Sequence, residues 1–191
     1  NWPQLYQYIQ LLSESTDESG TELFLSILAC IVCYLPIDFV ATLFDTILEK
    51  AKFALSTESI PVILAGSNLL KSFFTLVSSE PEIMIDVIMY MLNIFYVLLK
   101  GGSPICGEVM SNICSIIEEN TGFFETIQPL LELYYGMISD NEIPPESRII
   151  CTDLLCTLID QYPFEIESQL AQVISISLEL ASLTVVDDCY E

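Results

Sequence analysis

The strongest constraint in this sequence is a narrow polar stripe that runs along one apolar helical segment after another. In the segment that starts at Phe123 and runs to Ile138, polar residues recur at steps of three and four, and most positions between them are apolar. A helix with so little polar circumference needs apolar neighbours on two sides, and a stacked array of helical hairpins supplies them. The pattern therefore predicts an all-α chain. In this segment the stripe is Glu125, Gln128, Glu132, Tyr135 and Ser139.

Prolines recur where these segments begin and end, and they divide the chain into paired helices. Pro144 and Pro145 suit the first turn of a helix, where a missing backbone N–H costs no hydrogen bond, and Pro163 ends the helix before it. Helix starts are about 35 to 46 residues apart, a period typical of HEAT or armadillo repeats. We expect an α-α superhelix, a HEAT/armadillo-like solenoid of about four and a half hairpins, as one fragment of a longer protein. The predicted hairpins span residues 2–35, 37–79, 82–120 and 123–162, with a half-hairpin at 164–184.

Several helix ends are also predicted from local sequence. Thr21 and Ser59 are expected N-caps, and Ser103 with Pro104 is an expected cap and first turn. Gly101 and Gly102 are expected to end the helix that starts near Ile83. Unbroken helices are expected from Asp38, from Glu146 to Gln161, and after Pro163.

Acidic residues far outnumber basic ones. The chain has 27 Asp and Glu residues against 5 Lys and Arg, a formal net charge of −22 at pH 7. Such a surface repels the phosphates of nucleic acids and attracts basic protein segments. Excess acid also keeps a chain with 52% hydrophobic residues soluble, so charge alone assigns no function to a single carboxylate. We expect basic protein partners and no nucleic acid.

The segment from Ile83 to Leu99 is apolar enough to raise the question of a membrane span. It carries Asp86 and Asn93 on a single helical face, and basic flanking residues that would orient a span are absent. We therefore expect no membrane insertion.

Seven cysteines are present, and most lie in apolar helical runs. We expect free thiols that act as small core hydrophobes in a reducing compartment. Cys30 and Cys33 have the spacing of a redox motif, but they lie within a predicted helix with no strand before it, which disfavours a redox role. The cysteines in apolar runs are Cys30, Cys33, Cys106, Cys114, Cys151 and Cys156.

The residues that carry most enzymatic chemistry are missing from the sequence. There is no histidine, the usual general base and a common metal ligand, and no glycine-rich phosphate loop follows a predicted strand. Glu118 and Glu119 are neighbours on one helix and do not form a pair across a cleft. We expect a non-enzymatic protein with no cofactor and no metal site.

In residues 113–133 a predicted helix ends in the acidic pair Glu118 and Glu119, turns, and restarts with aromatic residues, a proline and paired leucines. This run resembles the repeat junction of the karyopherin-β (importin-β) family of nuclear transport receptors, most closely the branch that imports ribosomal proteins and histones. Residues 148–158 resemble its inner-helix core, with Cys151 in place of alanine and Asp153 in place of glutamate. Trp2, Pro3 and Leu5 resemble the start of an early repeat, and residues 186–191 an acidic exit loop. Ser115 stands where the family often has an acidic residue.

This resemblance implies a shuttling, cytoplasmic and nuclear receptor. Its second helices would line a concave groove for basic cargo and the GTPase Ran, and phenylalanine-glycine repeats of nucleoporins would bind between outer helices. A HEAT scaffold subunit of another assembly, such as a phosphatase or a chromosome-organising complex, would share the same sequence features. The expected concave-face residues are Glu22, Glu108, Asn112, Ser115, Glu118, Glu119, Glu146, Asp153 and Asp160.

Aromatic residues on the first helices are the candidate nucleoporin site. They would form small pockets for phenylalanine side chains, although aromatic stripes at helical spacing are more often part of a core. The expected residues are Tyr90, Tyr96, Tyr134, Tyr135 and Met137.

Overall fold

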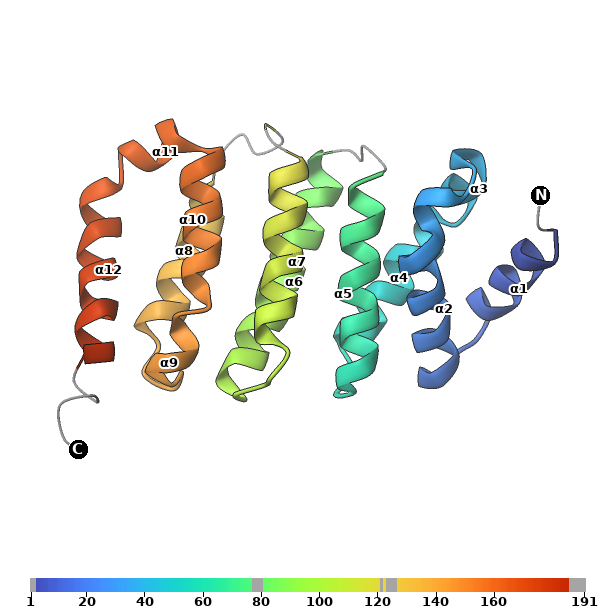
Figure 1. The fold of residues 1–191 in the computed structure, drawn as a ribbon, viewed down its shortest axis with the longest axis horizontal. Helices are drawn as coiled ribbons and strands as arrows, with labels where there is room; N and C mark the ends of the chain where they lie inside the picture. The colour runs from blue at the N-terminus through green and yellow to red at the C-terminus, as the bar shows by residue number, and fades with distance from the viewer. Residues whose placement is uncertain (1–2, 77–80, 121, 123–126, 186–191) are drawn as a thin grey trace. The chain divides into compact units, whose positions relative to one another are not determined.

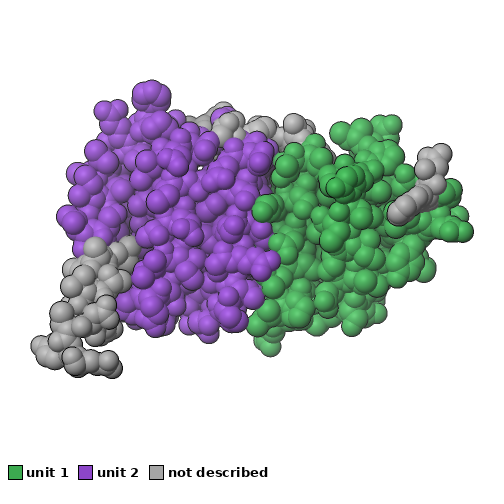
Figure 2. Space-filling model, viewed as in Figure 1, with its two compact units in different colours: residues 1–79 green, residues 80–191 purple. Residues whose placement is uncertain are grey.

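The computed structural model describes residues 3–76, 81–120, 122 and 127–185. Every regular element within these residues is a helix, as the sequence predicts. The chain divides into two compact units, unit 1 at residues 1–79 and unit 2 at residues 80–191 (Figure 2).

Unit 1 places its helices in two layers. Helices α2 and α5 pack along each other, α4 packs against both, and α1 packs against α2 (Figure 1). Their apolar stripes meet in a core that includes Ile9, Phe24, Ile47, Leu69 and Phe73. The elements are α1 (Pro3–Ser13), α2 (Glu18–Ile31), the 3₁₀ helix η1 (Val32–Tyr34), α3 (Ile37–Thr42), α4 (Phe44–Leu55) and α5 (Ile60–Phe74).

Gly66 lets α4 and α5 approach closely. A Cβ atom built on Gly66 would lie 3.0 Å from the Cβ of Ala54 and 3.4 Å from the carbonyl oxygen of Ala51. We expect Gly66→Leu to lower the free energy of unfolding by about 2 kcal/mol, because the added carbons force the two helices apart. Gly136→Ala is the control: nothing lies within 4 Å of its added Cβ, so the better helix former should raise stability by about 0.5–1 kcal/mol. Urea unfolding measures the free energy of unfolding of both variants. A stable Gly66→Leu variant would contradict the close approach.

Unit 2 repeats the two-layer arrangement. Helix α6 packs against α7 and α8, while α10 packs against α7 and α8 and α12 packs against α8 (Figure 1). Thus α6, α8 and α12 form one layer, and α7 and α10 form the other. The elements are α6 (Pro81–Lys100), α7 (Cys106–Glu119), α8 (Gln128–Ser139), α9 (Pro145–Arg148), α10 (Cys151–Gln161), α11 (Pro163–Glu167) and α12 (Leu170–Val185).

The end of α6 confirms the role expected of its two glycines. Gly102 has a φ of +62°, a left-handed conformation that glycine adopts without steric cost. The Ser103 N–H then donates to the Leu98 carbonyl at 3.0 Å, the six-to-one bond of a Schellman cap. Pro145 occupies the first turn of α9 as predicted, while Pro144 lies at the N-cap position before it.

Two predicted helix starts are wrong, and a third has the predicted position without the expected capping hydrogen bond. Helix α2 begins earlier than expected, because Asp17 caps it by accepting a hydrogen bond from the Gly20 N–H at 2.5 Å, and Thr21 is buried. Ser59 occupies the N-cap position of α5, but its side chain makes no capping hydrogen bond. Helix α7 begins at Cys106 with Ile105 at its N-cap, so Ser103 does not cap it and Pro104 does not lie in its first turn. The expected helix start at Phe123 lies outside the described residues, and the described helix begins at Gln128.

Three helices predicted to be continuous are interrupted. Leu43 separates α3 from α4 in a non-helical conformation, and nothing in the local sequence explains the break. Residues 149–150 separate α9 from α10, where the Ile150 and Thr152 N–H groups bond three residues back, at 3.2 and 2.9 Å. After Pro163, α11 ends at Glu167, and α12 restarts at Leu170 to pack against α8 and α9.

Residues 82–100 of α6 are long and apolar enough to cross a membrane by length and composition. The helix also serves as a core element of unit 2, with Met84, Met91, Phe95 and Leu99 buried. Core helices of soluble proteins pass the same test, so this one helix is weak evidence for a span.

Candidate functional site

Helices α7 and α10 each bury one face and leave an acidic face exposed. On α7, Val109, Ile113 and Ile117 are fully buried, and on α10 Leu154 and Leu158 are fully buried. Because these residues recur at steps of three and four, the polar residues between them gather on the opposite side. The exposed carboxylates of the two helices are Glu108, Glu118, Glu119, Asp153 and Asp160, and we call this set the acidic face.

The two helices lie in a parallel register. The Thr157 hydroxyl donates to Oε1 of Glu118 at 3.3 Å, across a separation of 39 residues. The carboxylates of Asp153 and Glu118 both act on the Cys114 thiol, so all three groups lie near one another. Burial, reinforced by these two negative charges, raises the pKa of Cys114 to about 11. Glu118 and Asp153 of the acidic face therefore approach each other across the seam between α7 and α10.

Other residues expected at the acidic face occupy different positions. Asn112 is only 3% exposed, so it faces the core and cannot meet a partner. Ser115 is half-buried, and its hydroxyl donates to the Ser111 carbonyl at 2.9 Å. Glu146 is exposed in α9, next to α10. Glu22 is half-buried on α2 in unit 1, outside the unit that carries the acidic face.

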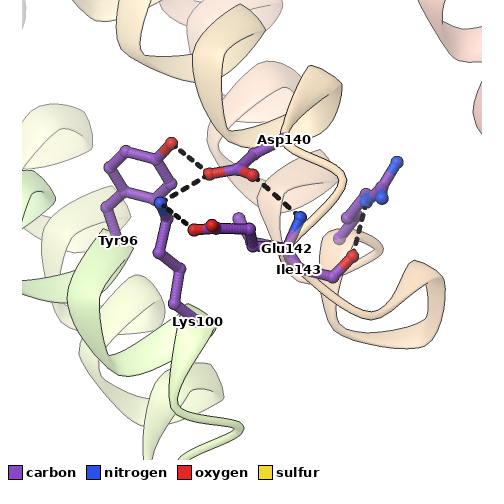
Figure 3. Close-up of polar contacts among 6 residues, drawn as sticks. Tyr96, Lys100, Asp140, Glu142 and Ile143 are labelled. Carbon is purple, nitrogen blue, oxygen red and sulfur yellow. Dashed lines mark hydrogen bonds and ion pairs between the residues drawn. The ribbon is translucent and has the colours of Figure 1, made fainter.

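The two basic side chains of unit 2 make their printed contacts away from Glu118 and Asp153. Residues 80–191 contain two basic side chains, Lys100 and Arg148. Lys100 forms ion pairs with Asp140 at 2.8 Å and Glu142 at 2.9 Å, in the cluster shown in Figure 3. Arg148 is buried and donates to backbone carbonyls within its own hairpin. Both cations are therefore committed away from α7 and the exposed side of α10.

The Lys100 cluster joins α6 to the loop after α8. The Tyr96 hydroxyl and the Lys100 ammonium both donate to the Asp140 carboxylate, and the Glu142 N–H donates to its other oxygen at 2.9 Å (Figure 3). Lys100, then Tyr96 and this N–H, hold the pKa of Asp140 well below its usual range. The same carboxylate raises the pKa of Tyr96 and of Lys100.

This cluster predicts acid-sensitive stability. A carboxyl whose folded pKa is depressed stabilises the fold above its unfolded pKa of about 4, and the stabilisation disappears as pH falls through the lower folded pKa. We expect the stability difference between wild type and Asp140→Asn to be constant above about pH 5 and to shrink steadily toward about pH 2. Urea unfolding at a series of pH values measures it. A difference that stays constant down to the acid end would contradict the ion pairing.

Two of the five residues expected in the aromatic pocket are buried in the core. Tyr134 and Met137 are 0% exposed and belong to the core, so neither can contact a partner from the surface. Tyr96 is engaged by Asp140, and the Tyr135 hydroxyl lies 3.4 Å from Oε1 of Gln169. Tyr90 is half-buried on α6.

The burial of the cysteines agrees only in part with the expectation. Cys106, Cys114 and Cys151 are buried, as predicted for core thiols. The other three described cysteines are exposed, contrary to that prediction: Cys30, Cys33 and Cys156. Cys30 lies in the last turn of α2 and Cys33 in η1, so this pair sits at a helix end and not in mid-helix.

Comparisons with known proteins give no match from which a family could be assigned. No family model, no curated protein and no solved structure matches it significantly. A function for this chain therefore has to be inferred from its residues and their geometry.

Proposed function

We propose that the chain is a non-enzymatic helical-repeat protein that holds a basic protein segment on the acidic face. The observation that carries the proposal is the approach of Glu118 and Asp153 across the seam between α7 and α10, where neither Lys100 nor Arg148 of unit 2 reaches them. A lysine- or arginine-rich segment would supply the missing countercharge and form charge-assisted hydrogen bonds.

The positions of these carboxylates on their helices support a binding function for them. Glu118 and Glu119 are the last two residues of α7, and Asp160 lies in the last turn of α10. The carboxyl end of a helix carries partial negative charge, so carboxylates there cost stability, by about 0.3–1 kcal/mol each. Residues that oppose the stability of their own helices are more readily explained by a bound partner than by folding.

The two-layer packing of unit 2 supports a HEAT-like solenoid as the architecture of this binding protein. Equivalent positions of α7 and α10 are 39 residues apart at the Glu118–Thr157 contact, within the about 35–47 residues typical of helical-hairpin repeats. In a solenoid, successive second helices present one continuous binding surface, which suits an extended basic segment.

The particular form that the sequence resemblance suggests is a karyopherin-β nuclear transport receptor, with basic cargo and Ran as partners. The proposal of a transport function depends on the resemblance of residues 113–133 and 148–158 to that family. The burial of Tyr134 and Met137 removes both residues from any nucleoporin site.

A titration of the whole chain with a fluorescent Lys- and Arg-rich peptide tests the binding function. We expect anisotropy to report binding at low salt and an affinity that falls as ionic strength rises, because exposed charges are screened. An acidic peptide of the same length is the control and should not bind. Equal binding of both peptides, or binding of the basic peptide that does not change with salt, would contradict the proposal.

Ran distinguishes a transport receptor from another helical scaffold. A receptor of the karyopherin-β type is expected to bind Ran loaded with GTP more tightly than Ran loaded with GDP. Binding of the basic peptide without any preference for Ran-GTP would keep the acidic-face function and reject the transport form.

A further inference from the structure

Unit 1 has an open groove between α2 and α5. Its volume is about 460 Å³, within the about 300–1,000 Å³ range of small-molecule sites. Most of the lining side chains are small or polar, so a ligand could approach the backbone of both helices and meet hydroxyl donors. The lining residues are Ser26, Ala29, Cys30, Ala65, Asn68, Lys71 and Ser72.

Lys71 gives this groove a positive charge that the described part of the chain does not neutralise. Lys100 is held in two ion pairs, and Arg148 and Lys50 donate to backbone carbonyls. Among the described residues, the Lys71 ammonium forms neither an ion pair nor a side-chain hydrogen bond. In a chain of net charge −22, an uncommitted ammonium in a groove indicates an anionic ligand.

An exposed thiol lines the same groove, and a second exposed thiol follows one turn later. Cys30 lies in the last turn of α2, and Cys33 lies in the 3₁₀ helix η1. Cys30 and Cys33 have the Cys-X-X-Cys spacing of redox motifs, and the junction between α2 and η1 lies between them. A change of backbone conformation at this junction can bring their Cα atoms within the about 4.4–6.8 Å that a disulfide bridges.

We propose that the α2–α5 groove binds a small anionic disulfide, of which glutathione disulfide is the representative, and that Cys30 reacts with it. Lys71 attracts a carboxylate of the ligand, and the hydroxyls of Ser26 and Ser72 offer further hydrogen bonds. The site is independent of the acidic face, because all of its residues belong to unit 1.

The reaction is thiol–disulfide exchange in two steps. The Cys30 thiol loses its proton to water, and the thiolate attacks one sulfur of the ligand, so that a Cys30–S–S bond forms and the first thiol leaves with a proton from water. The Cys33 thiolate then attacks the Cys30 sulfur and expels the second thiol. One disulfide is reduced to two small thiols, and the Cys30 and Cys33 thiols are oxidised to one disulfide.

Cys156 provides an internal comparison. It is also exposed, but it lies on α10 three residues after Asp153 and four residues before Asp160. Residues at these spacings share a helical face, so an anionic disulfide is repelled there. With a neutral disulfide, the reaction rates of Cys30 and Cys156 should differ far less.

The test measures the modification rate of each cysteine by peptide mass mapping in the Cys189→Ser chain, since Cys189 lies outside the described residues. Three probes are used: glutathione disulfide, neutral bis(2-hydroxyethyl) disulfide and cationic cystamine. We expect glutathione disulfide to modify Cys30 faster than Cys156, and cystamine to reverse this order. Cys33→Ser should stop the reaction at the mixed disulfide on Cys30.

Lys71→Gln tests the role of the ammonium. We expect it to slow the reaction of Cys30 with glutathione disulfide about fivefold, the effect of one exposed charge pair, while the rate with the neutral disulfide stays within about twofold. The neutral probe also shows that the variant is folded and that Cys30 is accessible. Equal slowing with both probes, or equal rates of Cys30 and Cys156 with glutathione disulfide, would overturn the proposal.

Discussion

Arg148→Met is expected to lower the free energy of unfolding by about 3 kcal/mol. The side chain is only 7% exposed, and its guanidinium donates to the Ile143 carbonyl at 2.9 Å and to the Ile138 carbonyl at 3.1 Å. The second bond satisfies a carbonyl in the last turn of α8, which has no later helical N–H to bind. Methionine fills similar space but leaves both buried acceptors unsatisfied, at about 1–3 kcal/mol each.

Urea unfolding of the whole chain measures this effect, and Lys100→Met is the matched control. It also removes one positive charge and introduces the same residue, but at an exposed ion pair, where the loss should be much smaller. If both variants lost the same stability, the effect would come from charge, and the buried hydrogen bonds of Arg148 would not explain it.

Neutralising the acidic face is expected to weaken binding of a basic peptide by on the order of 10- to 100-fold. The variant changes Glu118 and Glu119 to Gln and Asp153 and Asp160 to Asn. Each exposed ion pair contributes about 0.2–1 kcal/mol, so four together account for a change of this size. Stability should stay equal or rise, because three of the four carboxylates lie in the last turns of their helices.

The control variant makes the same four-charge change elsewhere in unit 2. It replaces exposed carboxylates of α6, α8 and α11, namely Asp86, Glu132, Glu165 and Glu167. Anisotropy titrations at one salt concentration compare the two variants. We expect the control to change affinity less than about threefold, as a general reduction of net charge would. Equal losses in both variants would assign binding to overall charge.

Local sequence predicted the helices and some of their ends, because these depend on residues close together in the chain. Apolar periodicity identified the helical segments, and glycine chemistry identified the end of α6. The Asp17 cap could also have been found, since aspartate is a preferred N-cap residue that precedes Glu18 directly. The break at Leu43 has no such local signal.

Other features depend on tertiary contacts, which the local sequence does not reveal. Tyr96 and Asp140 are 44 residues apart, so their hydrogen bond appears only once α6 packs beside α8. An arginine in an acidic chain suggests a surface residue, yet Arg148 is buried because carbonyls of the preceding turn surround it. Asn112 has the spacing of a surface stripe on α7, yet tertiary packing leaves it only 3% exposed.

The most direct test of the acidic face is zero-length cross-linking of a lysine-rich peptide to the chain with a carbodiimide. This reagent joins an amine to a carboxylate only when the two are in contact, so mass spectrometry of the products identifies the carboxylates that meet the peptide. We predict cross-links at Glu118, Glu119, Asp153 and Asp160 that disappear at high salt. Cross-links spread evenly over Asp86, Glu132, Glu165 and the acidic face would contradict a built binding surface.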